Sequence, residues 1–346
     1  MPGTKLRVIQ WATGNIGSRS LQRVIEHPGL ELAGLWVSAQ AKVGKDAGEL
    51  VGLPATGITA TDSVDEIIAL DADCVLYMPQ GCDWDVLCRL LASGKNIVTT
   101  RGEFHNPAMM APDKRAKVEA ACQAGGTSIY STGSSPGFST EVLPIALLSL
   151  SRRLDCLTID EYADCSSRDS ADMLFEIMGF GKPMGPMNPA QVEHLKHDFG
   201  NALGQTADAI GLSFDGIEAS GEFSAATSDV HIAAGVVKAG TVGAMRTTIA
   251  GMRQGKPVLR FRCNWFITTR IADAGWDLRD SGWRFLVEGD TPLKVDISFP
   301  VAPEDYAAFT PGLTAHRPVN AIAVVCAAAP GIRTTADLPQ VIAQFG

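Results

Sequence analysis

The sequence predicts an α/β protein with an N-terminal Rossmann-type, doubly wound parallel sheet and a C-terminal α+β domain with a mostly antiparallel sheet. Three observations lead to this fold class. A strand–turn–helix–strand pattern opens the chain at Leu6–Val37. Strand and helix patterns then alternate, which is typical of a parallel sheet with helices on both faces. From about Ser151 onward, long segments of alternating hydrophobicity replace them, as expected for antiparallel strands.

The opening pattern has the features of a dinucleotide-binding turn. An apolar run, Leu6–Trp11, predicts a buried strand, and the helical pattern that follows ends at Pro28-Gly29. Glycines between strand and helix allow a pyrophosphate to approach the backbone and the helix to pack closely on its strand. The first N–H groups of the helix attract phosphates. We therefore expect the cofactor to contact Thr13, Gly14, Asn15, Ile16 and Gly17, although Ala12 replaces the first glycine of the G-x-G-x-x-G pattern.

The end of the second strand bears on the choice of cofactor. NAD-selective folds carry an acidic residue here that binds the ribose 2′-hydroxyl, and this sequence has none. Ser38, Lys42 and Lys45 would suit a 2′-phosphate better. The sequence therefore favours NADP and leaves NAD possible. The alternative is that both lysines are merely solvated.

Further strand and helix patterns continue the predicted sheet. Ligands bind outside the carboxyl ends of parallel strands, so the loops that follow the strands should surround one crevice. Met78, Pro79 and Thr100 are the additional cofactor contacts expected there. The predicted strands are Gly57–Ala60, Cys74–Tyr77, Asn96–Thr99 and Thr127–Ser131, with helices capped by Asp62-Ser63 and by Asp83 and a later helix near Thr140–Leu150.

The chain divides into two predicted domains. Residues 1–150, completed by a segment at about 316–346, form the dinucleotide-binding domain. Residues 151–315 form a substrate-binding and dimerisation domain whose extended sheet suits a face-to-face homodimer. Helices are expected near Ser170–Met178 and Pro189–Leu212, and a last apolar helix near Pro318–Ala329 should return to the first domain.

Composition excludes several classes of protein. The formal charge of −9 and the lack of basic clusters argue against nucleic-acid binding. No apolar stretch reaches membrane-spanning length, and the N-terminus leaves no room for a signal peptide. Eight cysteines without a C-x-x-C pair fit reduced thiols in the cytoplasm. His194 and His197 lack a third ligand nearby, so we expect no metal site.

A dinucleotide crevice facing a second domain indicates hydride transfer by a nicotinamide cofactor, with the protein supplying orientation and a proton-handling group. Glu103 lies in a polar loop after the Asn96–Thr99 strand and is the candidate for that group. It can exchange a proton or pair with a cationic amine. From position alone, a solvated loop carboxylate is an equally good interpretation.

Four segments carry a family resemblance: V-I-Q-W-A-T-G-N-I-G, V-G-K-D-A-G-E-L, G-K-N-I-V-T-T and R-P-V-N-A-I-A-V-V-C. The chain resembles the dihydrodipicolinate-reductase-like superfamily, and within it native amine dehydrogenases and 2,4-diaminopentanoate dehydrogenase. The resemblance implies NAD(P)H-dependent interconversion of an amine with a ketone plus ammonia. The catalytic glutamate of that family follows the G-K-N-I-V-T-T strand and matches Glu103. Dihydrodipicolinate reductases proper carry a His-His motif with a lysine, and a Gly-Thr pair. Neither is present here, which disfavours a cyclic imine substrate.

The expected reaction is the reductive amination of a small ketone or aldehyde with ammonia, and its reverse, with Glu103 as the catalytic carboxylate. For each predicted residue of the apolar substrate wall, core packing is the more frequent role. These residues are Pro136, Phe138, Tyr162, Met173 and either Phe175 or Ile177. Two alternatives remain: a C=O or C=N reductase that needs no ammonia, and a non-catalytic regulatory protein that senses NADP.

Overall fold

The computed structural model describes residues 5–272 and 275–345, and the chain divides into two compact units. Unit 1 comprises residues 1–138 and 310–346, and unit 2 comprises residues 139–309. The boundary therefore falls earlier than the expected residue 150, and the C-terminal part of unit 1 begins slightly before residue 316. None of the helices formed by the described residues has the length and apolar character needed to cross a membrane.

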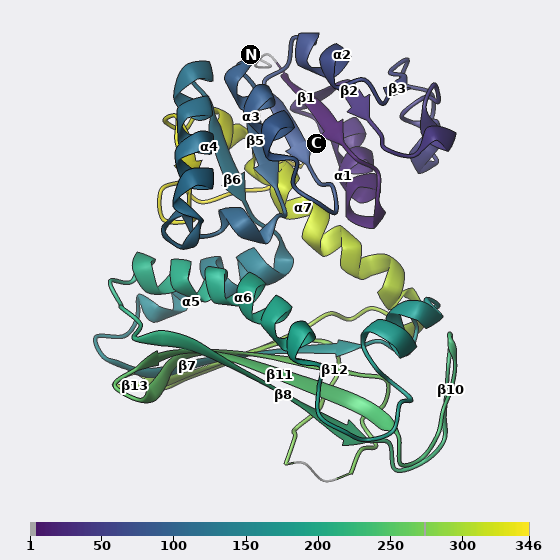
Figure 1. Cartoon of the computed structure of the whole chain (residues 1–346), viewed down its shortest axis with the longest axis vertical. Helices are drawn as coiled ribbons and strands as arrows, with labels where there is room; N and C mark the ends of the chain where they lie inside the picture. The colour runs from purple at the N-terminus through teal and green to yellow at the C-terminus, as the bar shows by residue number, and fades with distance from the viewer. Residues whose placement is uncertain (1–4, 273–274, 346) are drawn as a thin grey trace. The chain divides into compact units, whose positions relative to one another are not determined.

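Unit 1 is built on a seven-stranded sheet in the order β15-β6-β5-β4-β1-β2-β3, with every neighbouring pair parallel (Figure 1). Because β1 lies between β2 and β4, the strand order reverses at β1, and the carboxyl end of this strand is where sheets of this kind bind ligands. The predicted doubly wound sheet is confirmed. Its strands are β1 (Leu6–Trp11), β2 (Leu30–Trp36), β3 (Ala60–Thr61), β4 (Cys74–Tyr77), β5 (Asn96–Thr99), β6 (Ser128–Ser131) and β15 (Gly331–Arg333).

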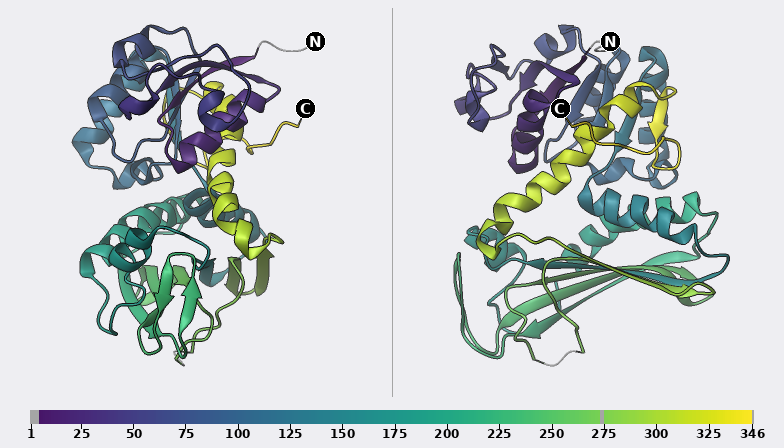
Figure 2. Two further views of the ribbon diagram at one scale, coloured as in Figure 1. Left: turned by 90° about the vertical axis from the view of Figure 1, so that its right-hand side faces the viewer. Right: turned by 180° about the vertical axis from the view of Figure 1, so that it is seen from behind.

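Helices cover both faces of this sheet (Figure 2). On one face α1 (Asn15–Glu26) buries Leu21 and Val24 in the same apolar cluster as Val319 and Ile322 of α7 (Tyr306–Cys326). The other face carries α2 (Val64–Ala69), α3 (Trp84–Ala92) and α4 (Pro112–Gly125). The predicted caps are present: Ser63 Oγ accepts from Glu66 N–H, and Asp83 Oδ1 accepts from Asp85 and Val86 N–H.

Three predicted elements differ from the structure. The strand expected at Gly57–Ala60 is reduced to the two residues of β3, because the Asp46 carboxylate accepts N–H bonds from Thr56 and Gly57 and holds that segment in a turn. The last helix, α7, begins at Tyr306 rather than near Pro318. Pro311 and Pro318 both lie inside the helix, so Pro318 does not mark its start. Of the helix expected near Thr140–Leu150, only α5 (Leu143–Leu148) is regular.

Unit 2 contains a six-stranded sheet in the order β14-β13-β7-β12-β11-β8. Its neighbours are antiparallel except for β7 and β12, so the predicted mostly antiparallel sheet is confirmed. Helix α6 (Pro189–Ala209) packs on one face, where Phe199 stacks on Phe261 at 4.2 Å between ring centroids (Figure 1). The strands are β7 (Leu154–Asp164), β8 (Gly216–Ala225), β11 (Val242–Arg253), β12 (Lys256–Phe266), β13 (Gly282–Gly289) and β14 (Leu293–Ser298), beside a hairpin of β9 (Val230–Ile232) and β10 (Gly235–Val237).

Candidate functional site

The turn between β1 and α1 is shaped for a close-approaching anion. Gly14 is the N-cap residue of α1 but supplies no side-chain cap, and the first turn of the helix holds no acidic residue. A Cβ at Gly14 would meet no atom within 4 Å, so space is open beside the free N–H groups. A Cβ at Gly17 would instead overlap the Ala12 carbonyl oxygen and lie 3.0 Å from its carbonyl carbon. The predicted phosphate-binding residues therefore form a turn that fits a dinucleotide pyrophosphate.

Ala12 takes the left-handed conformation that the missing glycine would normally adopt, with φ at 73°. Such a conformation strains any residue with a Cβ. The fully buried Gln10 side chain opposes that strain, because its Nε2 donates to the Ala12 carbonyl oxygen at 2.9 Å. The turn is thus held from inside the sheet.

The exit of β2 carries both signs of charge. Lys42 Nζ donates to the backbone oxygen of Thr13 at 2.9 Å and to its Oγ1 at 3.0 Å, while Ser38 and Lys45 are exposed. Asp62 also lies here, and its carboxylate accepts from Gln40 Nε2 at 2.7 Å. The sequence predicted Asp62 only as part of a helix cap and not as a residue of this site, because it follows β3 in the chain rather than β2.

An aromatic cavity of about 650 Å³ opens at the same edge of the sheet, on the side covered by α2, α3 and α4. Its walls include Trp11, Trp36 and Tyr77, the last residues of β1, β2 and β4, and Pro79 also lines it. The Trp11 and Trp36 rings stack at 4.4 Å. Flat aromatic walls suit a planar heterocycle such as a nucleotide base. These aromatic residues are not among the predicted site residues, although three neighbouring strands that each end in an aromatic residue are a usable signal.

Met78 lies on the other side of this edge. It is buried, and Ser20 Oγ of α1 lies 3.1 Å from its Sδ. Thr100 is partly buried at the end of β5.

Glu103 lies in a short helical turn, Gly102–Phe104, directly after β5. The fully buried Phe104 ring anchors the turn against Trp84 at 5.4 Å. The Glu103 carboxylate forms an ion pair with Arg101, whose Nε donates to Oε2 at 3.2 Å and whose Nη1 donates to the Gln80 carbonyl oxygen. Only 25% of the Glu103 side chain is exposed. The carboxylate is thus fixed beside the loop that follows β4, by an arginine that the sequence prediction did not include.

The charge of Glu103 also acts near the aromatic cavity. Burial raises the pKa of the Cys82 thiol to about 12, and the negative charge of Glu103 adds to this shift while Arg101 opposes it. Cys82 lines the aromatic cavity. Glu103 and the cavity therefore belong to one region of unit 1.

The predicted substrate-wall residues fall in both units. Pro136 and Phe138 are partly buried in the loop after β6, where the Arg317 guanidinium lies 6.0 Å from the Phe138 ring centroid and its Nε donates to Thr132 Oγ1 at 3.0 Å. In unit 2, Tyr162 is buried, whereas Met173 and Ile177 are 43% and 63% exposed on the helical turn Asp172–Ile177; Phe175 is partly buried.

Tyr162 packs with Phe266 and Ala244, under the Arg279 guanidinium at 5.4 Å from its ring centroid. This position favours core packing for Tyr162.

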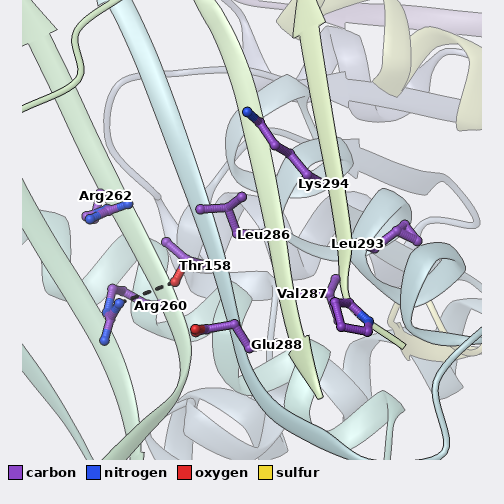
Figure 3. A pocket seen from close by; sticks show the side chains of 9 residues that line it. Thr158, Arg260, Arg262, Leu286, Val287, Glu288, Leu293 and Lys294 are labelled. Carbon is purple, nitrogen blue, oxygen red and sulfur yellow. Dashed lines mark hydrogen bonds between the residues drawn. The ribbon is translucent and has the colours of Figure 1, made fainter. Parts of the chain in front are cut away.

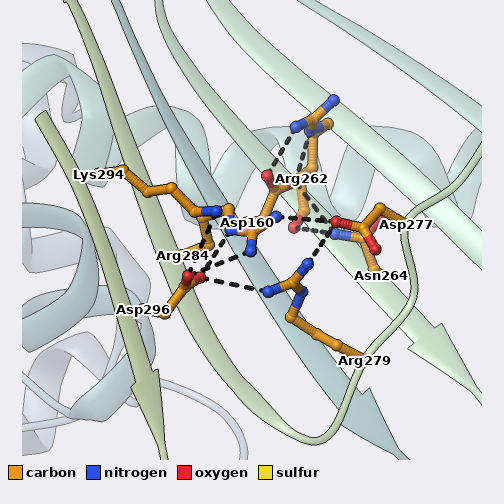
Figure 4. A network of polar contacts seen from close by, with 8 residues as sticks. All are labelled: Asp160, Arg262, Asn264, Asp277, Arg279, Arg284, Lys294 and Asp296. Atoms are coloured by element: carbon orange, nitrogen blue, oxygen red, sulfur yellow. Dashed lines mark hydrogen bonds and ion pairs between the residues drawn. The ribbon is translucent and has the colours of Figure 1, made fainter. Parts of the chain in front are cut away.

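The face of the unit 2 sheet opposite α6 is rich in charge. Figure 3 shows a cavity of about 470 Å³ on it, lined by Thr158, Arg260, Glu288 and Lys294 among others. Asp160, which is 1% exposed, accepts from Arg262 Nε at 2.5 Å and Nη2 at 2.6 Å within the network of Figure 4. Positively and negatively charged side chains therefore alternate across this face.

Comparison with known proteins agrees with the sequence resemblance. No protein-family model matches the chain. An amine dehydrogenase from Streptomyces virginiae is 29% identical, with 96% of each chain covered. Among solved structures, the amine dehydrogenase from Mycobacterium smegmatis matches with a TM-score of 0.76 at 20% identity, covering 99% of this chain and 98% of that one. A probable dehydrogenase from Thermotoga maritima matches with a TM-score of 0.55 at 12% identity, covering 96% and 92%.

The two structural matches share the fold of the whole chain, and the Streptomyces match extends along nearly all of its sequence. The comparisons thus confirm both the predicted resemblance to amine dehydrogenases and the prediction that this chain is an NAD(P)-dependent oxidoreductase.

Proposed function

We propose that the protein is an NAD(P)H-dependent amine dehydrogenase, which reductively aminates a small ketone or aldehyde with ammonia and catalyses the reverse oxidative deamination. The observation that carries this proposal is the largely buried Glu103 carboxylate, held by Arg101 at the carboxyl edge of the parallel sheet. The sequence similarity to an amine dehydrogenase over nearly the whole chain supports it.

The proposed roles follow from the chemistry of the side chains. The turn at Gly14 would hold the cofactor pyrophosphate, and the bound cofactor supplies the hydride. Glu103 orients ammonia and stabilises the cationic iminium formed when ammonia condenses with the carbonyl and water leaves. In reductive amination the iminium carbon accepts the hydride, and the nitrogen becomes an amine. In the reverse direction Glu103 takes up a proton as the amine is oxidised. Arg101 keeps the carboxylate in place between turnovers.

Turnover measurements test the reaction. NADPH is mixed with a panel of small ketones and aldehydes, with and without ammonium, and reduced-nicotinamide absorbance is followed. We expect oxidation that requires both ammonium and the carbonyl. Oxidation with the carbonyl alone would indicate an ammonia-independent reductase, and tight NADPH binding without oxidation would favour a regulatory sensor.

The Glu103→Gln variant tests the role of the carboxylate. It removes the negative charge and should abolish turnover while leaving NADPH affinity intact. Glu49→Gln, the same change at an exposed glutamate of unit 1, is the matched control and should retain full activity. Retained activity in the Glu103 variant would contradict the proposed role of Glu103 as the catalytic carboxylate.

We propose NADPH as the preferred cofactor. Lys42, beside the phosphate-binding turn, and the exposed Ser38 support a 2′-phosphate contact. Asp62 at the same strand exit is the feature that opposes it. Lys42→Met should therefore weaken NADPH binding by a larger factor than NADH binding. An equal loss for both would mean that Lys42 only supports the Thr13 turn.

We also propose that unit 2 contributes to substrate binding and forms a homodimer through the charged sheet face of Figures 3 and 4. A two-fold axis can pair its cationic groups, such as Arg260, with anionic groups of a second copy, such as Glu288. Sedimentation analysis should give a dimer that Arg260→Glu shifts toward monomer. A wild-type monomer at micromolar concentration would contradict this.

A further inference from the structure

Glu161 of unit 2 is held in an unusual way at the end of β7. Its Oε1 accepts from the indole Nε1 of Trp265 at 3.1 Å, and its Oε2 accepts from the indole Nε1 of Trp283, also at 3.1 Å. The tryptophans come from β12 and β13, the two strands that flank β7 in the sheet. Within residues 5–272 and 275–345, no lysine, arginine or histidine forms an ion pair with this carboxylate. Glu161 is therefore oriented by two neutral indole donors.

More aromatic side chains extend from this pair. Trp283 meets Phe299 edge-on at 5.2 Å, and Phe299 lies 5.4 Å from Phe309. Tyr306 belongs to the same group, because its ring lies 6.0 Å from that of Phe309. Burial raises the pKa of Tyr306, and the negative charge of Glu161 adds to the shift. Glu161 thus accepts hydrogen bonds from two indoles of the group and also acts electrostatically on Tyr306.

The group is accessible, and charged side chains of both signs lie near it. Glu161, Trp265 and Tyr306 are all partly exposed rather than buried. Asp164 and Arg168 also act on Tyr306, with Arg168 lowering and Asp164 raising its pKa.

We propose that Glu161 and these aromatic side chains form a binding site for an alkylammonium group, the protonated amine of the substrate or product. A carboxylate has about four lone-pair positions, and the indoles occupy two of them, so N–H donors of an ammonium can bind the others. Aromatic ring faces also attract cations, by about 0.5–2 kcal/mol depending on exposure. The site should therefore select a cationic amine over a neutral molecule of the same shape. This inference rests on the proposed function and names the charged form of the amine that unit 2 recognises.

Isothermal titration of the full chain without cofactor tests the site, using n-butylammonium as the probe and butan-1-ol as its neutral counterpart. Wild type should bind the cation more tightly than the alcohol. Glu161→Gln keeps the shape and removes the charge, so it should weaken cation binding about tenfold or more and leave the alcohol unaffected. Glu161→Asp should retain part of the preference. Glu193→Gln, the same change at an exposed glutamate of α6, is the matched control and should bind as wild type does.

Glu103→Gln separates this inference from the proposed function. Cation binding that is lost in Glu103→Gln and kept in Glu161→Gln would overturn the inference, as would equal losses of cation and alcohol in Glu161→Gln. If Glu161→Gln does not fold, Trp265→Phe removes one indole donor while keeping the charge. Because the carboxylate then loses one of the two donors that orient it, cation binding should weaken while alcohol binding stays unchanged, and an unchanged cation affinity would overturn the inference. Glu161-dependent binding in a protein that turns over no carbonyl would uphold the inference and remove the proposed function.

Discussion

Gly14 and Gly17 lie three residues apart in one turn, yet replacing each by alanine should produce opposite defects. A Cβ at Gly17 would overlap the Ala12 carbonyl oxygen, lie 3.0 Å from the Ala12 carbonyl carbon and lie 3.2 Å from Gln10 Nε2. None of these atoms can move freely, because Ala12 is already at a φ of 73° and Gln10 is fully buried. Overpacking of this kind costs about 1–3 kcal/mol. Gly17→Ala should therefore lower the melting temperature by several degrees without any cofactor present.

Gly14→Ala should leave the fold alone and impair binding. Gly14 has a φ of −67°, which alanine adopts readily, and the new methyl group would meet no protein atom within 4 Å. Replacing this helix-cap residue should change the free energy of unfolding by no more than about 1 kcal/mol, because its small stabilising and destabilising effects offset each other. The methyl group would instead occupy the space where the pyrophosphate approaches, so NADPH affinity should fall about tenfold or more.

The assays are thermal unfolding without cofactor and NADPH fluorescence titration. Two results would refute the reasoning: equal melting temperatures for the two variants, or wild-type NADPH affinity in Gly14→Ala. Either result would mean that the turn does not approach the cofactor as its open space indicates.

Three further predictions concern unit 1. Ala12→Gly should raise the free energy of unfolding by about 1 kcal/mol, because glycine adopts a positive φ without strain; chemical denaturation measures this, and no gain would contradict it. Burial, followed by the charges of Arg23 and Lys5, lowers the pKa of His27. The unfolded chain therefore takes up this proton at higher pH than the folded protein, and stability should fall as pH drops below about 6.5. His27→Gln should flatten that dependence in denaturation curves at pH 5 to 7, and identical slopes would contradict the assignment. Since burial raises the pKa of Cys82 to about 12, iodoacetamide at pH 7.5 should modify it only after denaturation, as peptide mass spectrometry can show; rapid alkylation of the native protein would be inconsistent.

The sequence predicted the parallel sheet because its strands are short apolar runs followed by capped helices. It could not predict features that depend on polar contacts between distant residues. Asp46 draws Thr56 and Gly57 into a turn and removes most of an expected strand. The three-residue β15 carries too little pattern to be recognised.

The site residues also divide into those that local patterns predict and those that depend on contacts between distant parts of the chain. The glycine turn and Glu103 follow from local patterns and from the family resemblance. The tryptophan partners of Glu161 lie 104 and 122 residues away in the chain, and only the register of the unit 2 strands brings them together. The Arg101 pairing with Glu103 is local, but sequence alone does not distinguish it from a solvated arginine.

The placement of β15 has a consequence for synthesis on the ribosome. β6 is made early, but its neighbour β15 and the apolar face of α7 that covers the sheet follow the whole of unit 2 in the chain. While residues 139–309 are being translated, the nascent unit 1 exposes an unpaired strand edge and an uncovered apolar surface. Both features promote aggregation. Unit 1 is therefore expected to be prone to aggregation until α7 and β15 have emerged, and a chain interrupted within unit 2 should remain so.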